Sequence, residues 1–243
     1  MNFGEKSKIH SKEKMIEFLN TEHTGHFTTI DSEGFPFTAP MNFTYYNDSI
    51  YVHGFPRGEK YDNIKNNEKC GFEVSKELAF LPSYFFEPKD DASKTDTLYV
   101  SVIIKGTASI IEDIEQKCNV LNCMMEKYQP EGKYKKLTPD MPMMRGVGMI
   151  KISINSMTGR YKMGKYWNES EKLVIAQRIM ERAVNEPKLT LQTLNIAGLD
   201  KLEGTEIQKV AWHYSSKIVS QMGYSNELQY PEISLVVTSN VNW

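Results

Sequence analysis

The feature of this sequence that most constrains its fold is a series of short segments rich in β-branched and aromatic residues, separated by turn signals. Polar and apolar residues alternate within several of them, as expected of strands that bury one face. The predicted strands span residues 25–30, 35–46, 50–53, 70–75, 98–111 and 146–156. Many short strands with few helices between them favour a closed or nearly closed β-barrel. The predicted fold class is therefore mainly β, a β-barrel with helices.

Helical patterns lie between and around these strands. Ser11 has the position of a helix cap for residues 12–20, and a further helix is predicted near residues 61–67. Asp113 and Gln116 have the spacing of a cap for a helix that ends near residue 128. Residues 77–97 read as an irregular surface excursion, and residues 157–160 as a turn that leaves the last barrel strand.

The pattern changes near residue 166, where helical periodicity replaces alternation. An amphipathic helix is predicted at 171–184, a second helical stripe ends at Gly223, and 233–238 reads as a final strand. The expected domains are a barrel over residues 1–165 and a C-terminal α-helical extension over 166–243. The extension is expected to pack on the barrel through its tryptophans, Trp167, Trp212 and Trp243.

Charge and cysteine content exclude several classes of partner. The formal net charge is -2 and the isoelectric point is near 6.2, so the chain lacks the basic excess of a nucleic-acid-binding protein. No apolar run reaches the roughly 20 residues of a membrane-spanning helix, and the N-terminus lacks the apolar core of a signal peptide. The 3 cysteines show no CxxC spacing, which favours reduced thiols in the cytoplasm.

One stretch has the pattern of an anion site. The strand at 50–53 runs into a Pro/Gly turn, and a helix opened by Glu59 follows. A strand, a glycine-containing turn and a helix start together present free backbone N–H groups and the positive end of a helix dipole. Arg57 and Lys60 add positive charge to this corner, and His53 ends the strand that enters it.

The strand at 35–46 carries a second signal, because Pro36 and Pro40 interrupt it. Proline has no amide hydrogen, so it lies at an edge or a bulge, or where a ligand rather than a neighbouring strand meets the backbone. The sequence therefore predicts an open strand edge near Pro40.

Taken together, residues 25 to about 160 resemble the FMN-binding split-barrel superfamily, and within it the nitroimidazole-resistance (Nim) branch of pyridoxamine 5'-phosphate oxidase-like proteins. Each matching piece is short, and the signal lies in their order and spacing. The pieces are GHFTT at 25–29, GFPFTAPMNF at 34–43, IYVHG at 50–54, GEK at 58–60, NIKNN at 63–67, CGFEV at 70–74, YVSVI at 99–103 with Gly106, and Thr158 with Gly159.

The resemblance implies a six-stranded antiparallel FMN-binding split barrel and a homodimer with two FMN sites at its interface. It places the flavin ring along residues 38–43 and the phosphate at residues 53–60, with a further hydroxyl contact on the long strand. The implied cofactor-binding residues are Thr38, Pro40, Met41, Asn42, Phe43, His53, Gly54, Arg57, Gly58, Lys60 and Ser101. The Arg and Lys that pyridoxamine-phosphate oxidases carry on the second strand are replaced near Thr38 and Asn42, so the resemblance does not extend to vitamin B6 oxidation.

The expected function is that of an FMN-dependent oxidoreductase of the Nim type, which reduces a small nitro-aromatic or related acceptor and so confers resistance to 5-nitroimidazoles. His53 matches a histidine assigned a catalytic role in Nim-like proteins, and its expected role is to donate a proton. The alternatives are a non-catalytic flavin- or haem-binding or sensing protein, and a barrel without any cofactor. The extension caps the flavin pocket, enlarges the dimer interface or enlarges the core.

The histidines do not indicate a metal site. His23 and His26 are three residues apart at a strand entry, which puts their side chains on opposite faces of the strand. Cys118 and Cys123 lie on a helical stripe and are expected in the core. No metal is therefore expected.

Overall fold

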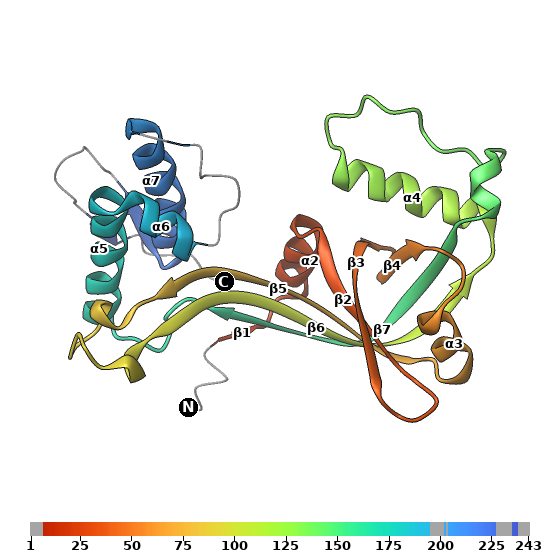
Figure 1. Cartoon of the computed structure of the whole chain (residues 1–243), viewed down its shortest axis with the longest axis horizontal. Helices are drawn as coiled ribbons and strands as arrows, with labels where there is room; N and C mark the ends of the chain where they lie inside the picture. The colour runs from red at the N-terminus through yellow and green to blue at the C-terminus, as the bar shows by residue number, and fades with distance from the viewer. Residues whose placement is uncertain (1–6, 195–201, 203, 227–234, 238–243) are drawn as a thin grey trace. The chain divides into compact units, whose positions relative to one another are not determined.

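The fold is that of a computed structural model, which describes residues 7–194, 202, 204–226 and 235–237 (Figure 1). The chain divides into two compact units. One unit comprises Ile9–Ser75 and Ser101–Gly159, and the other comprises Met1–Lys8, Lys76–Val100 and Arg160–Trp243. The predicted domain boundary at residue 165 stays a prediction, because compactness does not measure which part of a chain folds alone.

Most strands belong to one sheet that closes on itself. Its order is β1-β7-β4-β3-β2-β5-β6, and β6 also pairs with β7. The strands are β1 (Lys8–Ile9), β2 (Thr24–Ile30), β3 (Pro36–Tyr46), β4 (Ser49–Gly54), β5 (Lys69–Leu81), β6 (Asp96–Ile111) and β7 (Gly148–Lys162). Six long strands thus form the ring, and the two-residue β1 adds to β7. The predicted mainly β, six-stranded split-barrel fold is confirmed.

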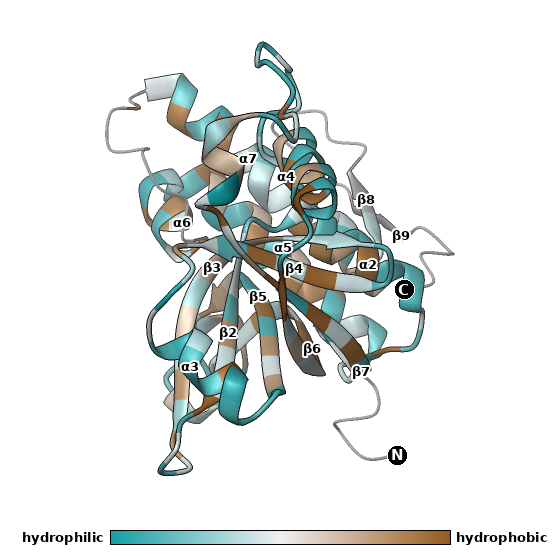
Figure 2. Ribbon diagram, turned by 90° about the vertical axis from the view of Figure 1, so that its right-hand side faces the viewer, coloured by the Kyte–Doolittle hydropathy of each residue, from teal (hydrophilic) through white to brown (hydrophobic). Residues whose placement is uncertain are grey.

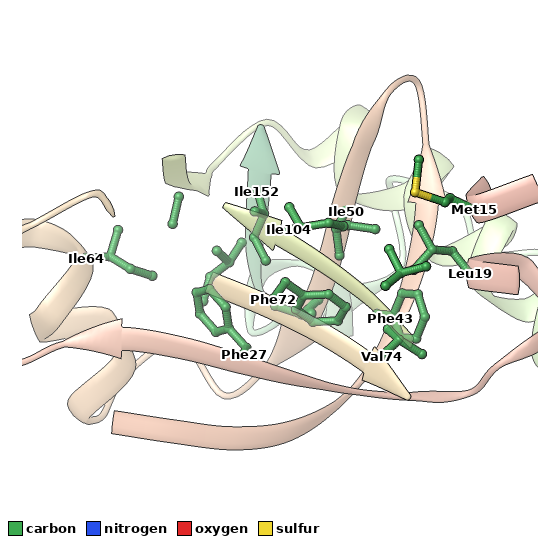
Figure 3. Packing of buried hydrophobic residues seen from close by; sticks show 14 of the residues in the cluster. Met15, Leu19, Phe27, Phe43, Ile50, Ile64, Phe72, Val74, Ile104 and Ile152 are labelled. Carbon is green, nitrogen blue, oxygen red and sulfur yellow. The ribbon is translucent and has the colours of Figure 1, made fainter. Parts of the chain in front are cut away.

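The inside of the ring is an apolar core. Polar and apolar residues alternate along the strands (Figure 2). The apolar side chains that face inward form a buried cluster (Figure 3). Phe43 and Phe72 meet there edge to face, with ring centroids 5.1 Å apart. Gly106, predicted as a bulge, allows β6 to approach β7 closely, because a Cβ there would lie 2.6 Å from the carbonyl oxygen of Ser153.

Three helices belong to the same unit as most of the ring. They are α2 (Lys12–Thr21), α3 (Glu59–Asn66) and α4 (Ile114–Tyr128). The Ser11 and Asp113 side chains accept hydrogen bonds from the amides of Lys14 and Gln116, so both predicted helix caps are confirmed. A second buried cluster, which includes Tyr51, Leu121 and Met149, lies between α4 and the outer face of the sheet.

The other unit contains the C-terminal helices α5 (Glu169–Asn185), α6 (Pro187–Thr193) and α7 (Gly204–Gln221). It also contains the 3-10 turns η1 (Ser83–Phe85) and η2 (Ala92–Lys94), and the paired strands β8 (Tyr224–Asn226) and β9 (Leu235–Val237). Gly223 has φ 102° just after α7, as the predicted helix end requires. The remainder of the predicted strand at 233–238, and Trp243, lie outside the described residues.

Two sequence predictions about strand ends are wrong. Residues 77–97 were expected to be irregular, but β5 continues to Leu81, with Ala79 and Leu81 buried. Residues 157–160 were expected to turn, but β7 continues to Lys162. Gly159 serves packing rather than a turn there, since a Cβ would lie 2.9 Å from side-chain atoms of Ile9 and Met15.

No helix among residues 7–194 and 204–226 is both long enough and apolar enough to cross a bilayer.

Candidate functional site

The central feature of the candidate site is a fork between β3 and β4. Residues 36–42 of β3 pair with β2, whereas only residues 43–46 pair with β4. The last pair before the two strands part is Phe43 with Val52. The edge of β3 that would face β4 therefore has no strand beside residues 36–42 in the part of the chain that the structure describes. Pro40, predicted to mark an open edge, lies in this segment.

Two predicted site residues stand on either side of the fork. Thr44 of β3 pairs with Tyr51 of β4 on the outer face of the sheet. Asn42 lies two residues before Thr44 on β3, and His53 lies two residues after Tyr51 on β4. Because side chains alternate along a strand, these two lie on the same outer face, and both are exposed. On the inner face, the Cε atom of Met41 lies 3.9 Å from where a Cβ on Gly54 would stand. The structure thus brings Met41, Asn42, His53 and Gly54 together.

The exposed face of β3 before the fork is formed by Thr38, Pro40 and Asn42. The hydroxyl of Thr38 lies 2.9 Å from that of Thr28 on β2, so this side chain is already hydrogen-bonded within the sheet. Phe43, in contrast, is fully buried in the core. The Phe43 side chain is therefore not available to a ligand.

The end of α4 takes over from β2 at the fork. The β2–β3 pairing ends at Thr24 and Asn42, so β2 forms no ladder hydrogen bond with Phe43. The amide of Phe43 donates instead to the Tyr128 hydroxyl at 2.9 Å, and the amine of Lys127 donates to the Phe43 carbonyl at 3.1 Å. The Tyr128 hydroxyl donates to the carbonyl of His23. These two side chains satisfy backbone groups that would otherwise be left without partners.

Lys127 performs this role in a partly buried position. Its amine also donates to the carbonyl of Leu19 at 2.9 Å and lies 3.7 Å from the centroid of the Phe43 ring. Burial lowers the pKa of Lys127 from 10.5 to about 8, against the opposing effect of the negative charges of Glu22 and Cys123. Lys127 is not predictable as a site residue from sequence, because a lysine near a helix end usually faces solvent and its partners are distant along the chain.

The predicted anion corner follows β4 directly. Gly58 precedes α3 with φ 103° and ψ 176°, a conformation open to glycine alone. It supplies no side-chain cap, and the first helical turn closes through its carbonyl, which accepts from Tyr61 and Asp62. The amides of Glu59 and Lys60, at the helix start, have no side-chain cap. The corner therefore offers an anion uncapped N–H groups as predicted.

The packing behind this corner fixes its position. A Cβ on Gly148 would lie 2.2 Å from the Tyr61 hydroxyl and 2.6 Å from the Cα of Pro56, so β7 presses closely on the turn. The Tyr61 hydroxyl is buried without a hydrogen-bond partner among the described residues. Burial, together with the nearby charge of Glu112, raises the pKa of Tyr61 to about 12.

Both predicted cations are present at the corner. Arg57 is exposed, with its guanidinium 4.4 Å from the centroid of the Phe55 ring. Lys60 stands in the first turn of α3, with its amine 5.6 Å from the centroid of the Tyr61 ring. Neither forms an ion pair with another described residue. Their charges are available to an anion, and Arg57 offers a planar set of donors that suits two oxygens at once.

His53 lies between the fork and the corner. It pairs with Met149 on β7, so its backbone is fixed within the sheet. The surrounding protein atoms lower the pKa of the His53 imidazole below its ordinary value by desolvation, although the side chain still reaches solvent. At neutral pH the ring is therefore mostly uncharged, able to donate one N–H and accept at its other nitrogen.

Other candidates lie apart from this group. Ser101 is buried on β6, which pairs with β5 and β7 rather than with β3 or β4, and its role stays a prediction. His26 pairs with Glu73 at 3.0 Å, and His23 stacks against Tyr128 at 4.5 Å between ring centroids. Among the described residues, no three His, Cys, Asp or Glu side chains gather as metal ligands do.

The lowered pKa of Lys127 predicts a measurable pH dependence. The folded amine releases its proton near pH 8, whereas the unfolded chain retains it to about pH 10.5. Between these values the unfolded state binds more protons, so the free energy of unfolding should gain a contribution that rises with pH. In Lys127→Met this contribution should vanish. Urea unfolding of both proteins from pH 7.5 to 10 measures the difference between their slopes, and equal slopes would rule out the lowered pKa.

Comparison with known proteins agrees with this geometry. A family model described as pyridoxamine 5'-phosphate oxidase matches residues 11–161, which is more than half of the 243-residue chain. The match includes β3, β4 and the corner before α3. A comparison with curated proteins gave no match.

Several solved structures share the fold. A protein assigned to 5-nitroimidazole antibiotic resistance from Bacteroides thetaiotaomicron is 24% identical, with a TM-score of 0.53 over 63% of this chain and 84% of that one. The flavocytochrome Anf3 from Azotobacter vinelandii is 18% identical, with a TM-score of 0.58 over 71% and 78%. An FAD- and heme-binding protein from Mycobacterium smegmatis is 14% identical, with a TM-score of 0.56 over 70% and 80%.

At these identities the solved structures show the fold alone. The family match is stronger, because it spans the closed sheet and the fork together. The predicted resemblance to the flavin-binding split barrels is confirmed, and the chain belongs to the pyridoxamine 5'-phosphate oxidase family.

Proposed function

We propose that the protein is an FMN-dependent oxidoreductase of the Nim type that reduces a small nitro-aromatic or related acceptor. The observation that carries the proposal is the fork. It leaves one edge of β3 open directly beside a corner rich in anion donors. A flat ring with a phosphate tail needs these two features next to each other. Membership of a flavin-binding family supports the same assignment.

The residues present fit the two ends of FMN. At the phosphate end, the uncapped amides at the start of α3 and the charges of Arg57 and Lys60 form a donor set for a dianion. At the ring end, the backbone of residues 38–42 borders the open edge, and Pro40 contributes no amide hydrogen to it. Thr38 and Asn42 flank this segment on its exposed face. When bound, the flavin supplies the electron transfer, while the protein binds and orients.

His53 has a position suited to proton transfer. It stands on the exposed face beyond the last β3–β4 pair, opposite Asn42, and its backbone is held by β7. Reduction of a nitro group takes up protons as well as electrons, so a histidine beside the acceptor can deliver one. Because its pKa is lowered, the imidazolium is most populated in mildly acidic solution.

The proposed function includes a homodimer with the flavin at its interface. Large apolar side chains are exposed on the barrel unit. Phe35 is 64% exposed, Phe55 is 60% exposed and Ile103 is 49% exposed. Phe55 belongs to the corner itself, so a second chain that covered it would also close the phosphate site. Exposed apolar side chains of this size favour an interaction surface, and a second copy of the chain could cover them.

The first test concerns the phosphate. Replacing Arg57 and Lys60 together with alanine should weaken FMN binding by about tenfold or more, because charge-assisted bonds to the phosphate are lost. Riboflavin lacks the phosphate, so its affinity should change little. Flavin fluorescence quenching measures both. Lys65→Ala is the matched control, since Lys65 lies on the same helix but pairs with Asp62 at 3.5 Å. Equal losses for FMN and riboflavin would place the phosphate elsewhere.

The second test concerns His53. With the bound flavin reduced by light, the rate of its reoxidation by 2-methyl-5-nitroimidazole should rise as pH falls through the lowered pKa of His53. His53→Gln should keep FMN, lose this rise and slow the reaction by about 100-fold. His213→Gln is the control, because His213 is an exposed residue of α7, which belongs to the other unit. Unchanged rates in His53→Gln would remove its catalytic role, and bound flavin without turnover in the wild type would favour the non-catalytic alternative.

The third test concerns assembly. Sedimentation velocity should give the mass of two chains for the wild type, and Phe55→Ser should shift the population toward single chains and weaken FMN binding with it. Both effects are expected together because Phe55 would lie at the dimer interface and beside the phosphate. A wild-type monomer that binds FMN fully would contradict the interfacial site.

A further inference from the structure

The unit that contains the C-terminal helices holds a cavity of its own. It has a volume of about 710 Å³ and lies between the η1–η2 segment and the first half of α5. All the residues that line it belong to this unit. The volume falls within the range of about 300–1,000 Å³ that is typical of small-molecule sites.

One wall of the cavity is aromatic, and the structure fixes it in place. Phe86 and Trp167 both line the cavity, with ring centroids 5.8 Å apart. The indole lies against Gly164, where a Cβ would come within 2.1 Å of the ring. Gly164 also has φ 68°, which glycine adopts without strain. The Trp167 ring is therefore seated before any ligand arrives, which reduces the entropy cost of binding against it.

Most of the charged side chains that line the cavity have partners. Arg178 donates to the carbonyl of Tyr84 at 3.3 Å and to Glu87 at 3.0 Å. Asp96 pairs with Lys162, and the Glu171 carboxylate accepts from the amide of Asn168 in the capping box of α5. Lys94 also lines the cavity and forms no ion pair with another described residue, so the cavity is compatible with an uncharged ligand and with one that bears an anionic group.

Arg178 nevertheless has donors to spare. A guanidinium carries five N–H groups, and only two hydrogen bonds are formed here. Arg178 lines the cavity and is anchored by the Tyr84 carbonyl, so it can present a further N–H to a ligand atom. The cavity therefore combines a surface for stacking with one fixed hydrogen-bond donor.

We propose that this cavity binds a planar heteroaromatic molecule, stacked on Trp167 with its edge toward Phe86, whose ring is tilted 59° from the indole, and with an acceptor atom bonded to Arg178. Pairs of aromatic rings in offset or edge-to-face contact gain free energy beyond that of burying their area. The site is independent of the flavin proposed for the barrel unit, and it can exist whether or not that flavin binds.

Quinoline-3-carboxamide is a suitable probe, since it is flat, uncharged at pH 7.5 and carries acceptor atoms. Its binding to the full chain is measured by saturation-transfer NMR and by calorimetry, with and without excess FMN. Binding that persists in excess FMN does not come from the probe occupying the flavin site. The wild type should bind it. Trp167→Leu should weaken binding by at least about fivefold, Trp167→Phe should retain most of it, and Arg178→Met should weaken it. Cyclohexanecarboxamide, which has the amide but no aromatic ring, should not bind.

Trp212→Leu is the matched control, because Trp212 lies on α7 and does not line the cavity. Thermal unfolding shows whether each variant is folded, and Trp167→Phe keeps the test decisive if the leucine variant is not. Failure of the wild type to bind, equal binding by wild type and folded Trp167→Leu, or equal binding of the saturated amide would each overturn the proposal.

Discussion

The candidate site depends on the parting of β3 from β4 beyond the Phe43–Val52 pair. A strand edge without a neighbour normally invites pairing with another chain or must be protected. Here it lies within a sheet that is otherwise closed, because β4 continues to pair with β7 while β3 continues to pair with β2. The opening is thus a local gap in a rigid ring rather than a free end, and both of its sides are held by full strand pairing.

Next to the fork, α4 satisfies the backbone groups of Phe43 that β2 does not reach. Beyond the start of β2, the amide and carbonyl of Phe43 bond to Tyr128 and Lys127. This arrangement has an energetic cost, because it holds a lysine amine in a partly buried position and lowers its pKa. The cost is offset by several hydrogen bonds and by the Phe43 ring beneath the amine. An apolar side chain at that position would remove the Lys127 donor from the carbonyls of Leu19 and Phe43.

The sequence predicts the local parts of this structure well and the long-range parts poorly. Alternation places β2, β3 and β4 within about a residue or two, and Ser11 and Asp113 cap helices as expected, because each signal lies within a few residues. The resemblance adds the closed six-stranded order, which no local pattern gives. The extension of β5 and β7 depends on burial against distant partners. The capping box of Asn168 and Glu171 was readable from its spacing but was overlooked, and α5 was predicted to start two residues late.

Site residues divide along the same line. Arg57, Gly58 and Lys60 can be predicted from sequence because a turn before a helix is a local pattern with known electrostatics. Lys127 is not, since its role is defined by carbonyls more than eighty residues away. His53 is intermediate, because its position at a strand end is local but its lowered pKa reflects the atoms packed around it. Desolvation favours its neutral form, whereas an anion held at the adjoining corner would favour the imidazolium. By thermodynamic linkage, protonation of His53 then raises the affinity of the corner for the anion by the same factor by which the bound anion raises the proton affinity of His53. The charge of His53 in the occupied site therefore depends on which anion the corner binds.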